Sequence, residues 1–184
     1  MIDWGMMLRS LLLVAAILPL RAAAAQAGVR QVQLTSPGTI VAFRAYGLGL
    51  FPLDGNFSRF DGVLTYDDAQ AGVCRVDLRV EVASLMMSDQ SIRNDLVGPE
   101  FMNAGEFPTL RFQGTCQGPE LVGQLAMRGV TRPFALDLSP EGTVVTAQGR
   151  LRRAEWGMTA RPFVGGSTAR ITVQVTVPTL WSAR

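Results

Sequence analysis

The sequence predicts an all-β protein of about eight strands in one antiparallel sheet, with a single short helical insertion. Three features support this prediction: short runs of alternating apolar and polar residues, turn residues between the runs, and one break in the alternation at residues 88–101. Strict alternation is typical of a strand with one face buried and the other in water. The sheet can form a sandwich or close into a barrel, and closure removes the exposed edges that promote aggregation.

The chain begins with a segment that has the layout of an export signal. Arg9 precedes an apolar run at residues 11–20, and small residues follow that run. This order predicts a signal peptide over residues 1–25, cleaved near residues 25–27. The alternative is an uncleaved membrane anchor, although the apolar run is too short to span a bilayer comfortably. We therefore expect an exported domain over residues 28–184, without stable membrane insertion.

Alternating runs and their flanking turn residues place the strands in order along this domain. The clearest run, at residues 73–85, puts cysteine, valine and leucine on one face and alternating charges on the other. The hairpin at residues 123–138 has Gly129 at its turn and Pro133 at the start of its second strand. The other runs expected to be strands lie at residues 39–47, 56–67, 107–116, 142–151 and 169–177.

The break in the alternation predicts a short helix. Ile92 and Leu96 are four residues apart, as on one face of a helix. Ser88 is the expected N-cap, and Gly98 followed by Pro99 is the expected end. The insertion separates the run that ends near residue 85 from the run that begins near residue 107.

The composition excludes several kinds of catalytic site. The chain contains no histidine, and all 17 basic residues are arginine, so lysine is absent as well. Nucleophiles paired with histidine, histidine bases and lysine Schiff bases are therefore excluded. The two cysteines lack metal-site spacing, and a formal net charge of +2 without a basic run gives no surface for nucleic acid. A carboxylate enzyme using Asp61, Asp95 and Glu155 is not excluded, although no motif supports it.

Cys74 and Cys116 both belong to the apolar face of their strands. If these strands are antiparallel neighbours with Val80 opposite Leu110, the same register places the cysteines opposite each other, close to disulfide range. Export makes such a bond chemically plausible. The alternative is two small buried side chains that never meet, and of the two we expect the disulfide.

Four segments of the chain, read in order, resemble the YceI-like lipid/polyisoprenoid-binding family. They are FSRFDGVLTYD, IRNDLVGPEFMNAGEFPTLRF, GQLAMRGVTRPFALDL and LRRAEWGM, and the resemblance extends from about Val32 to Val177. The turn at residues 129–133 is the most specific element, supported by residues 106–109 and 156–158. The resemblance implies a lipocalin-like, eight-stranded antiparallel barrel with a helix closing one end. It also implies export to the periplasm and a tunnel that holds an isoprenoid chain, such as a quinone or polyprenyl tail.

The sequence departs from that family's pattern at polar positions. Family members commonly carry histidines, one of them just before the Gly-Val-Thr turn, where this chain has Arg128. The helical insertion, where another histidine tends to lie, is a residue shorter around Asn94 and Asp95. The segment between Gly157 and Ala169 is abbreviated as well. These differences leave the predicted barrel intact and concern the end at which a head group would lie.

The inward-facing apolar residues are candidates for the wall of this tunnel. They form a dry core if the barrel is filled, and they line a slot for the lipid if the resemblance holds. One five-carbon isoprene unit offers on the order of 3–4 kcal/mol gross, so roughly three or more units would reach micromolar affinity. The candidates are Val41, Phe43, Phe57, Val76, Leu78, Val80, Leu110, Phe112, Leu125, Met127, Leu136, Trp156, Val173 and Val175.

Polar contacts to a head group are expected from the insertion and from the shortened segment. The candidates are Arg93, Asp95, Arg153 and Arg161. Arginine can grip a pyrophosphate with two hydrogen bonds or donate to a quinone carbonyl. Each of these side chains can equally be an ordinary solvated charge.

These observations favour a non-catalytic periplasmic carrier for an isoprenoid lipid or quinone, with no required cofactor and no metal. The alternatives are an exported interaction module with a filled barrel and the carboxylate enzyme. A continuous internal cavity distinguishes the carrier from the filled module. We expect no nucleic-acid partner, and the chain is compatible with a homodimer.

Overall fold

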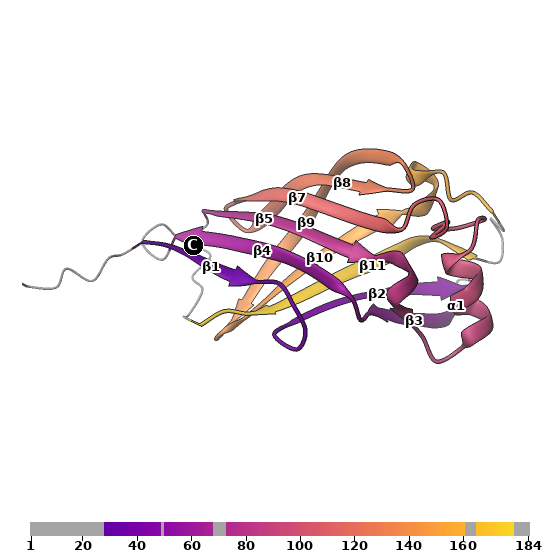
Figure 1. The fold of residues 1–184 in the computed structure, drawn as a ribbon, viewed down its shortest axis with the longest axis horizontal. Coiled ribbons are helices and arrows are strands. Elements are labelled where there is room, and N and C mark those ends of the chain that lie inside the picture. Colours follow the sequence, from indigo (N-terminus) through magenta and orange to yellow (C-terminus); the bar gives the residue numbers. More distant parts are fainter. Residues whose placement is uncertain (1–27, 49, 68–72, 161–164, 179–184) are drawn as a thin grey trace, which may run out of the picture.

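Eleven antiparallel strands form one curled sheet in the part of the chain that the structure describes (Figure 1). This computed structural model describes residues 28–48, 50–67, 73–160 and 165–178, so the predicted signal peptide lies outside the described residues. The strands are β1 (Val29–Gln33), β2 (Thr39–Gly47), β3 (Phe51–Phe57), β4 (Phe60–Asp67), β5 (Cys74–Glu81), β6 (Leu85–Met86), β7 (Thr109–Gln117), β8 (Glu120–Met127), β9 (Val130–Glu141), β10 (Val144–Arg152) and β11 (Gly165–Thr176). The helical elements are α1 (Gln90–Val97) and two 3₁₀ helices, η1 (Val82–Ser84) and η2 (Arg153–Trp156).

The strand order is β1-β4-β5-β7-β8-β9-β10-β11-β2-β3-β6. Strand β11 pairs with β2 from Ala169 opposite Ala45 to Val175 opposite Thr39, which brings the last strand beside one of the first. Strand β6, which follows β5 through η1, pairs with β3 at the other side of the sheet. The Ser58 N–H donates to the Ser84 carbonyl at 3.1 Å and strengthens this junction. The two sides of the curled sheet are therefore joined near α1.

The expectation of eight strands in a closed barrel is wrong in detail, because β1, β3 and β6 have no clear alternation. Strand β1 is almost wholly exposed, and β6 has only two residues. Strand β3 contains Pro52 and Gly55, which in the sequence indicate a turn. Pro52 is tolerated because that part of β3 pairs with β2 alone. Gly55 leaves room for a ring, because a Cβ there would lie 2.5 Å from a ring carbon of Phe43.

The hairpin between β8 and β9 is tighter than the sequence predicts. Its two turn residues, Arg128 and Gly129, have φ angles of 51° and 72°, the pattern of a type I′ turn. Residues 130–133 already belong to β9, and Pro133 lies opposite Gln124. Pro133 precedes the part of β9 that pairs with β10, so its missing N–H leaves that ladder intact.

Helix α1 lies within the predicted insertion and ends at Gly98 as expected, but its N-cap is Asp89 and not Ser88. The Asp89 carboxylate accepts hydrogen bonds from the N–H groups of Ser91 at 2.8 Å and Ile92 at 3.0 Å. Figure 1 shows α1 at the end of the sheet where the β2–β3 hairpin turns. No helix among the described residues combines the length and the apolar character needed to cross a membrane.

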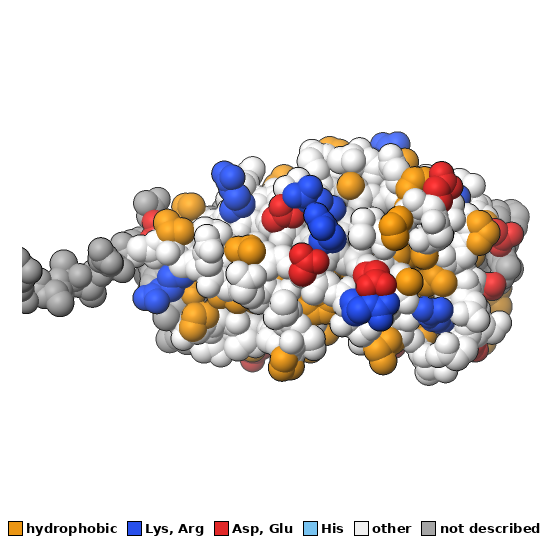
Figure 2. Space-filling view, viewed as in Figure 1, with side chains coloured by type: hydrophobic (Ala, Val, Ile, Leu, Met, Phe, Trp, Pro, Cys, Tyr) orange, Lys and Arg blue, Asp and Glu red, His pale blue; other side chains and the backbone are white. Residues whose placement is uncertain are grey.

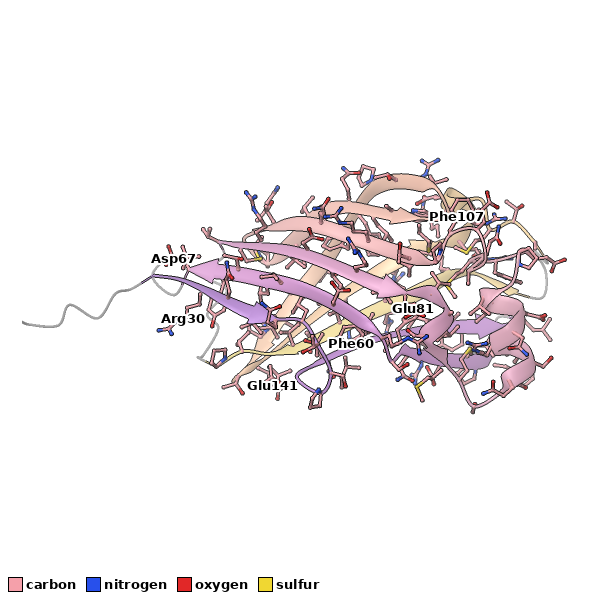
Figure 3. The ribbon with its side chains drawn as sticks, viewed as in Figure 1. Arg30, Phe60, Asp67, Glu81, Phe107 and Glu141 are labelled. Atoms are coloured by element: carbon pink, nitrogen blue, oxygen red, sulfur yellow. A yellow bond between two sulfur atoms is a disulfide. The ribbon has the colours of Figure 1, made fainter. Side chains whose placement is uncertain are left out.

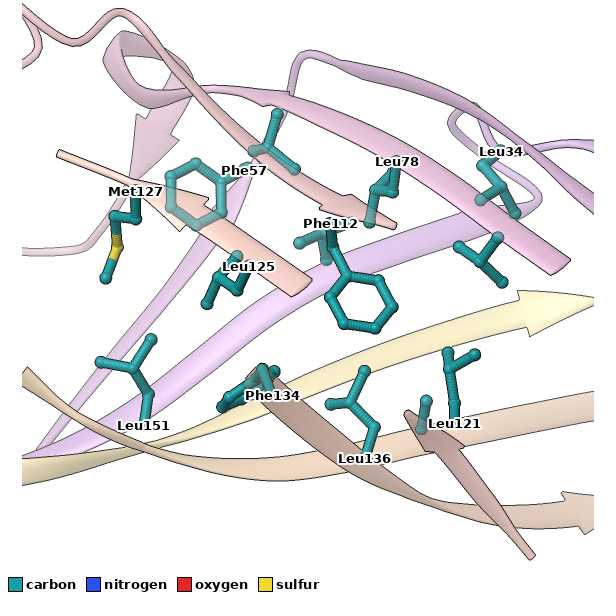
Figure 4. Close-up of a cluster of buried hydrophobic side chains, with 14 of the residues drawn as sticks. Leu34, Phe57, Leu78, Phe112, Leu121, Leu125, Met127, Phe134, Leu136 and Leu151 are labelled. Carbon is teal, nitrogen blue, oxygen red and sulfur yellow. The ribbon is translucent and has the colours of Figure 1, made fainter. Parts of the chain in front are cut away.

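The outer face of the sheet carries charged side chains, and arginine and carboxylate groups lie beside one another there (Figure 2). Arg30, Asp67 and Glu141 lie toward the end of the sheet away from α1 (Figure 3). The inner face is apolar, with side chains from several strands converging as shown in Figure 4. The outer ion pairs, with their N–O distances, are Arg44–Asp54 at 2.6 Å, Arg59–Glu81 at 2.5 Å and Arg111–Asp77 at 2.7 Å.

Candidate functional site

The inner face of the sheet encloses an apolar cavity of about 180 Å³ at the α1 end. Strands β2, β5, β7 and β8 each contribute two of the predicted lining residues, because every second side chain of a strand points to the same face. Arg153 is the one charged residue among the described residues that line the cavity. The predicted residues in its wall are Val41, Phe43, Phe57, Leu78, Val80, Leu110, Phe112, Leu125, Met127, Leu136 and Val173.

A second and smaller cavity of about 50 Å³ lies further along the interior. Val76 and Val175, which the sequence assigned to the tunnel wall, line this smaller cavity and not the larger one. Cys74 and Cys116 also line it, joined by a disulfide with a Cα–Cα distance of 4.9 Å. The small cavity therefore marks the disulfide end of the interior.

Trp156 is not part of either wall. Its side chain is 1% exposed, its ring meets the Phe134 ring edge-on at 6.2 Å, and its Nε1–H donates to the Leu125 carbonyl at 3.3 Å. Trp156, which the sequence placed in the lipid-binding wall, contacts Phe134 and Leu125 and lines neither cavity. Its indole supports the two residues that do line the cavity.

Several lining residues come from segments without a strand pattern. Leu96 on α1, Phe101 and Met102 just after it, and Met158 after η2 contribute to the α1 end of the cavity. The Met102 N–H donates to the Leu96 carbonyl at 2.9 Å and folds the segment back onto the helix. Leu96 has the helical spacing from Ile92 noted in the sequence, but no periodicity marks Phe101, Met102 or Met158. Phe134 and Ile171, by contrast, are two residues before Leu136 and Val173 on their strands, so alternation places them on the same inward faces.

Of the predicted head-group residues that the structure describes, only Arg153 lines the cavity. Its Nη1 donates to the carbonyls of Met158 at 3.1 Å and Ala160 at 2.6 Å, and its guanidinium lies 5.5 Å from the centre of the Phe101 ring. Burial lowers the pKa of Arg153 below its ordinary value. Arginine still keeps its proton at neutral pH, so the wall carries a positive charge held in a fixed position.

The other head-group candidates do not line the cavity in the described structure. Arg93 donates to the carbonyls of Leu85 at 3.0 Å and Ala83 at 2.5 Å, which attaches α1 to η1 and β6. Asp95 is half-buried on α1 outside the cavity wall. Arg161 lies outside the described residues.

Arg128, which stands where the family pattern has a histidine, also makes structural contacts. Its guanidinium donates to the Gly157 carbonyl and, at 3.0 Å, to the Pro99 carbonyl. It thus connects the β8–β9 turn to the segments after η2 and α1. None of these contacts places its charge in the cavity wall.

The three carboxylates considered for an enzyme do not line either cavity. Asp61 is on β4 opposite Arg79, while Glu155 lies in η2, 3.7 Å from an Arg152 nitrogen. Among the described residues, no three histidine, cysteine, aspartate or glutamate side chains form a group able to hold a metal ion.

Comparison with known proteins identifies sequence relatives of this chain. A family model described as a YceI-like domain matches residues 32–179. A UPF0312 protein of Yersinia enterocolitica is 31% identical over 102 residues, and one of Yersinia pestis is 30% identical over the same length. Each of these alignments covers 53% of this chain and 53% of the relative, so the chain spans about half the length of the curated relatives that it matches.

Solved structures share the fold at low sequence identity. The crystal structure of BcnA from Burkholderia cenocepacia has a TM-score of 0.63 at 16% identity, covering 74% of this chain and 94% of that one. A YCEI protein from Campylobacter jejuni has a TM-score of 0.58 at 19% identity, covering 66% and 81%. A polyisoprenoid binding domain from Saccharophagus degradans, implicated in plant cell wall breakdown, has a TM-score of 0.57 at 10% identity, covering 81% and 99%. These likenesses show a common fold.

Proposed function

The chain belongs to the YceI-like domain family, and on that premise we propose that it binds an isoprenoid lipid by its apolar tail. The observation that carries the proposal is the apolar cavity of about 180 Å³ in the α1 end of the curled sheet. A structure of the same fold is a polyisoprenoid binding domain, which supports the ligand class. A filled interior, as in an interaction module, would not leave a cavity of this size.

The cavity's size and lining suit part of a hydrocarbon chain. An engineered apolar cavity of about 150 Å³ binds benzene, so a cavity near 180 Å³ has room for about seven carbons. Each buried methylene contributes about 0.8 kcal/mol gross, which makes the tail the main source of affinity. Among the described lining residues, only Arg153 and Thr168 have a polar side chain to offer a head group.

The head group is proposed to lie beside Arg153. This guanidinium is held by two backbone carbonyls and the Phe101 ring, so little freedom is lost when a ligand binds. A diphosphate, a phosphate or a quinone carbonyl can each accept a hydrogen bond from it. We infer a non-catalytic carrier, exported to the periplasm after cleavage of its signal peptide, with the lipid as its cargo.

The proposal is tested by comparing the wild type with a variant whose cavity is filled. Leu110→Trp adds apolar bulk to the cavity wall, at the expense of some overpacking strain. Thr115→Trp adds the same ring to the exposed face of the same strand and is the matched control. Native mass spectrometry with organic extraction should find isoprenoid lipid in the wild type and the control, and far less in Leu110→Trp.

Titration of delipidated protein with a quinone that has three isoprene units completes the test. The wild type and Thr115→Trp should bind it alike, while Leu110→Trp should bind at least tenfold more weakly. Equal binding by all three proteins, or binding by none of them, would contradict a tail in this cavity. Thermal unfolding of the three proteins confirms that each is folded.

A further inference from the structure

The two cavities of the interior share four lining residues. They are Leu78, Phe112, Leu136 and Val173, which come from β5, β7, β9 and β11. Because these strands lie on different sides of the curled sheet, the four side chains form a constriction between the cavities. Figure 4 shows the Phe112 ring at this place, with Leu78 and Leu136 above and below it.

Four other labelled side chains in Figure 4 lie on one side or the other of Phe112. Leu125 and Met127, which line the larger cavity, are on one side of the ring. Leu34 and Leu121, which line the smaller cavity, are on the other side. Phe112 therefore lies on the path from the α1 end to the disulfide end of the interior.

The sequence around Phe112 explains how its ring occupies this place. Gly114 is two residues further along β7 and faces the same side, and a Cβ there would lie 2.8 Å from Cζ of Phe112. The absence of that Cβ lets the ring extend along the strand toward the small cavity. The ring is also held by an edge-on contact with Phe134 at 6.4 Å. Phe112 is the one aromatic residue among the four that the cavities share.

The volumes of the two cavities limit how much of an isoprenoid tail can lie on the Arg153 side of this constriction. The larger cavity has room for about seven carbons, roughly one and a half isoprene units. A tail of about three units has about fifteen carbons, so most of it exceeds that space. With the head near Arg153, the free end of the tail points toward Phe112, and the small cavity of about 50 Å³ is beyond it.

We propose that Phe112 determines how much of an isoprenoid tail the protein recognises. The tail ends against its ring, and further units remain outside the larger cavity, where they add no buried contact. A smaller side chain at this position joins the two cavities and lets the tail continue toward the Cys74–Cys116 disulfide. This inference rests on the proposed function, since it concerns the same cavity and the same class of ligand.

The experiment measures Kd for a series of quinones that share one head group and carry one to six isoprene units. For the wild type, each added unit should lower Kd at least tenfold until the tail reaches Phe112, after about the second unit, and Kd should then stay constant. In Phe112→Leu, Kd should keep decreasing for at least one further isoprene unit, and that unit should raise the affinity by about another tenfold. Displacement of a fluorescent apolar probe provides the readout, and thermal unfolding shows that the variant is folded.

Leu121→Ala is the matched control, because Leu121 lines only the small cavity. It enlarges the space beyond the ring without opening the constriction, so Kd should become constant at the same tail length as in the wild type. The proposal is overturned if the wild-type Kd keeps decreasing through six isoprene units. It is also overturned if the Kd of Phe112→Leu becomes constant at the same tail length as that of the wild type. Either result leaves lipid binding itself in place, whereas binding of no quinone by the wild type removes both proposals.

Discussion

The α1 end and the disulfide end of the interior are made from the same alternating strands but enclose different amounts of space. The cavity at the α1 end measures about 180 Å³, against about 50 Å³ at the disulfide end. At the disulfide end, Leu34 is almost completely buried among strand residues, and a covalent bond joins β5 to β7. At the α1 end, the wall is completed by Leu96, Phe101 and Met102, which cover the interior from outside the sheet.

This difference shows that alternation of apolar and polar residues along the strands is not enough to create a cavity. Strand side chains that meet from all sides interdigitate and pack at the density of a crystal. A helix and a loop that cover an opening contact only the outer layer of side chains, and space remains beneath them. The strands thus provide the inner face, and the segment between β6 and β7 covers it at the α1 end, where the larger cavity lies.

Removal of the disulfide should have the largest effect on stability. Cys74→Ala combined with Cys116→Ala frees a loop with a sequence separation of 42 residues, which lowers the free energy of unfolding by at most about 4 kcal/mol in the chain-entropy model. Urea unfolding measures the change, and reduced wild type should match the double variant. Because the bond is distant from Arg153, a quinone with two isoprene units should still bind.

The disulfide itself can be checked in protein recovered from a periplasmic fraction. Alkylation after unfolding, with and without prior reduction, followed by mass spectrometry, should label the cysteines only after reduction. Two labelled thiols in the unreduced sample would contradict a disulfide at this end.

An intermediate effect is expected from the charge at the α1 end. Arg153→Met keeps an apolar wall but removes the guanidinium, which should weaken binding of geranyl diphosphate, a two-unit ligand, by about 1.5 kcal/mol, roughly tenfold. Geraniol, which has the same tail and no charge, should lose much less affinity. Isothermal titration calorimetry gives the affinity for each ligand, and the ratio of the two affinities measures the contribution of the charged head group.

Arg93→Met is the control for this prediction, because Arg93 contacts the carbonyls of Leu85 and Ala83 and does not line the cavity. It should lower the thermal stability of the α1 end without changing the ratio of the two affinities. An equal loss of affinity for both ligands in Arg153→Met would assign Arg153 a structural role alone.

The smallest effect should come from acid acting on the exposed ion pairs near α1. Hydrogen bonds from Arg44 and Arg59 lower the pKa of Asp54 and Glu81, respectively. The folded protein therefore binds these protons less readily than the unfolded chain, so the pairs stabilise the fold above the ordinary carboxyl range. That contribution is lost as the pH falls below about 4 and passes the lowered pKa values, and solvent screening keeps it small.

Hydrogen exchange at pH 3 and pH 6 can compare the two ends. Exchange from β2 and β3 around Asp54 should become faster at pH 3, and exchange from β5 around Asp77 should do the same, because a hydrogen bond from Arg111 lowers that pKa as well. Asp54→Asn should remove the acid response of β2 and β3 and leave that of β5, while Asp77→Asn should do the opposite. An acid response of β2 and β3 that persists in Asp54→Asn would contradict the assignment to these pairs.

Much of the inner face could be predicted from the sequence because alternation is a local property. Val41, Leu78 and Leu125 face inward wherever their strands pair, since a strand sends every second side chain to the same side. The register assumed for the disulfide, with Val80 opposite Leu110, is the one that the structure has. Trp156 was misplaced because it lies in a 3₁₀ helix, where its position relative to the wall has no period of two.

The sequence by itself determined that the chain is all-β, which side chains form its inner face, that catalysis through histidine or lysine is excluded, and which family the chain resembles. The tertiary structure decided that the inner face encloses more space at the α1 end than at the disulfide end, that Phe112 is among the four residues shared by the two cavities, and that Arg153 rather than Arg93 lines the larger one. The reason is physical: the direction of a side chain follows from its own strand. The space between side chains depends instead on distances between β5, β7, β9 and β11 and on the segment that covers them.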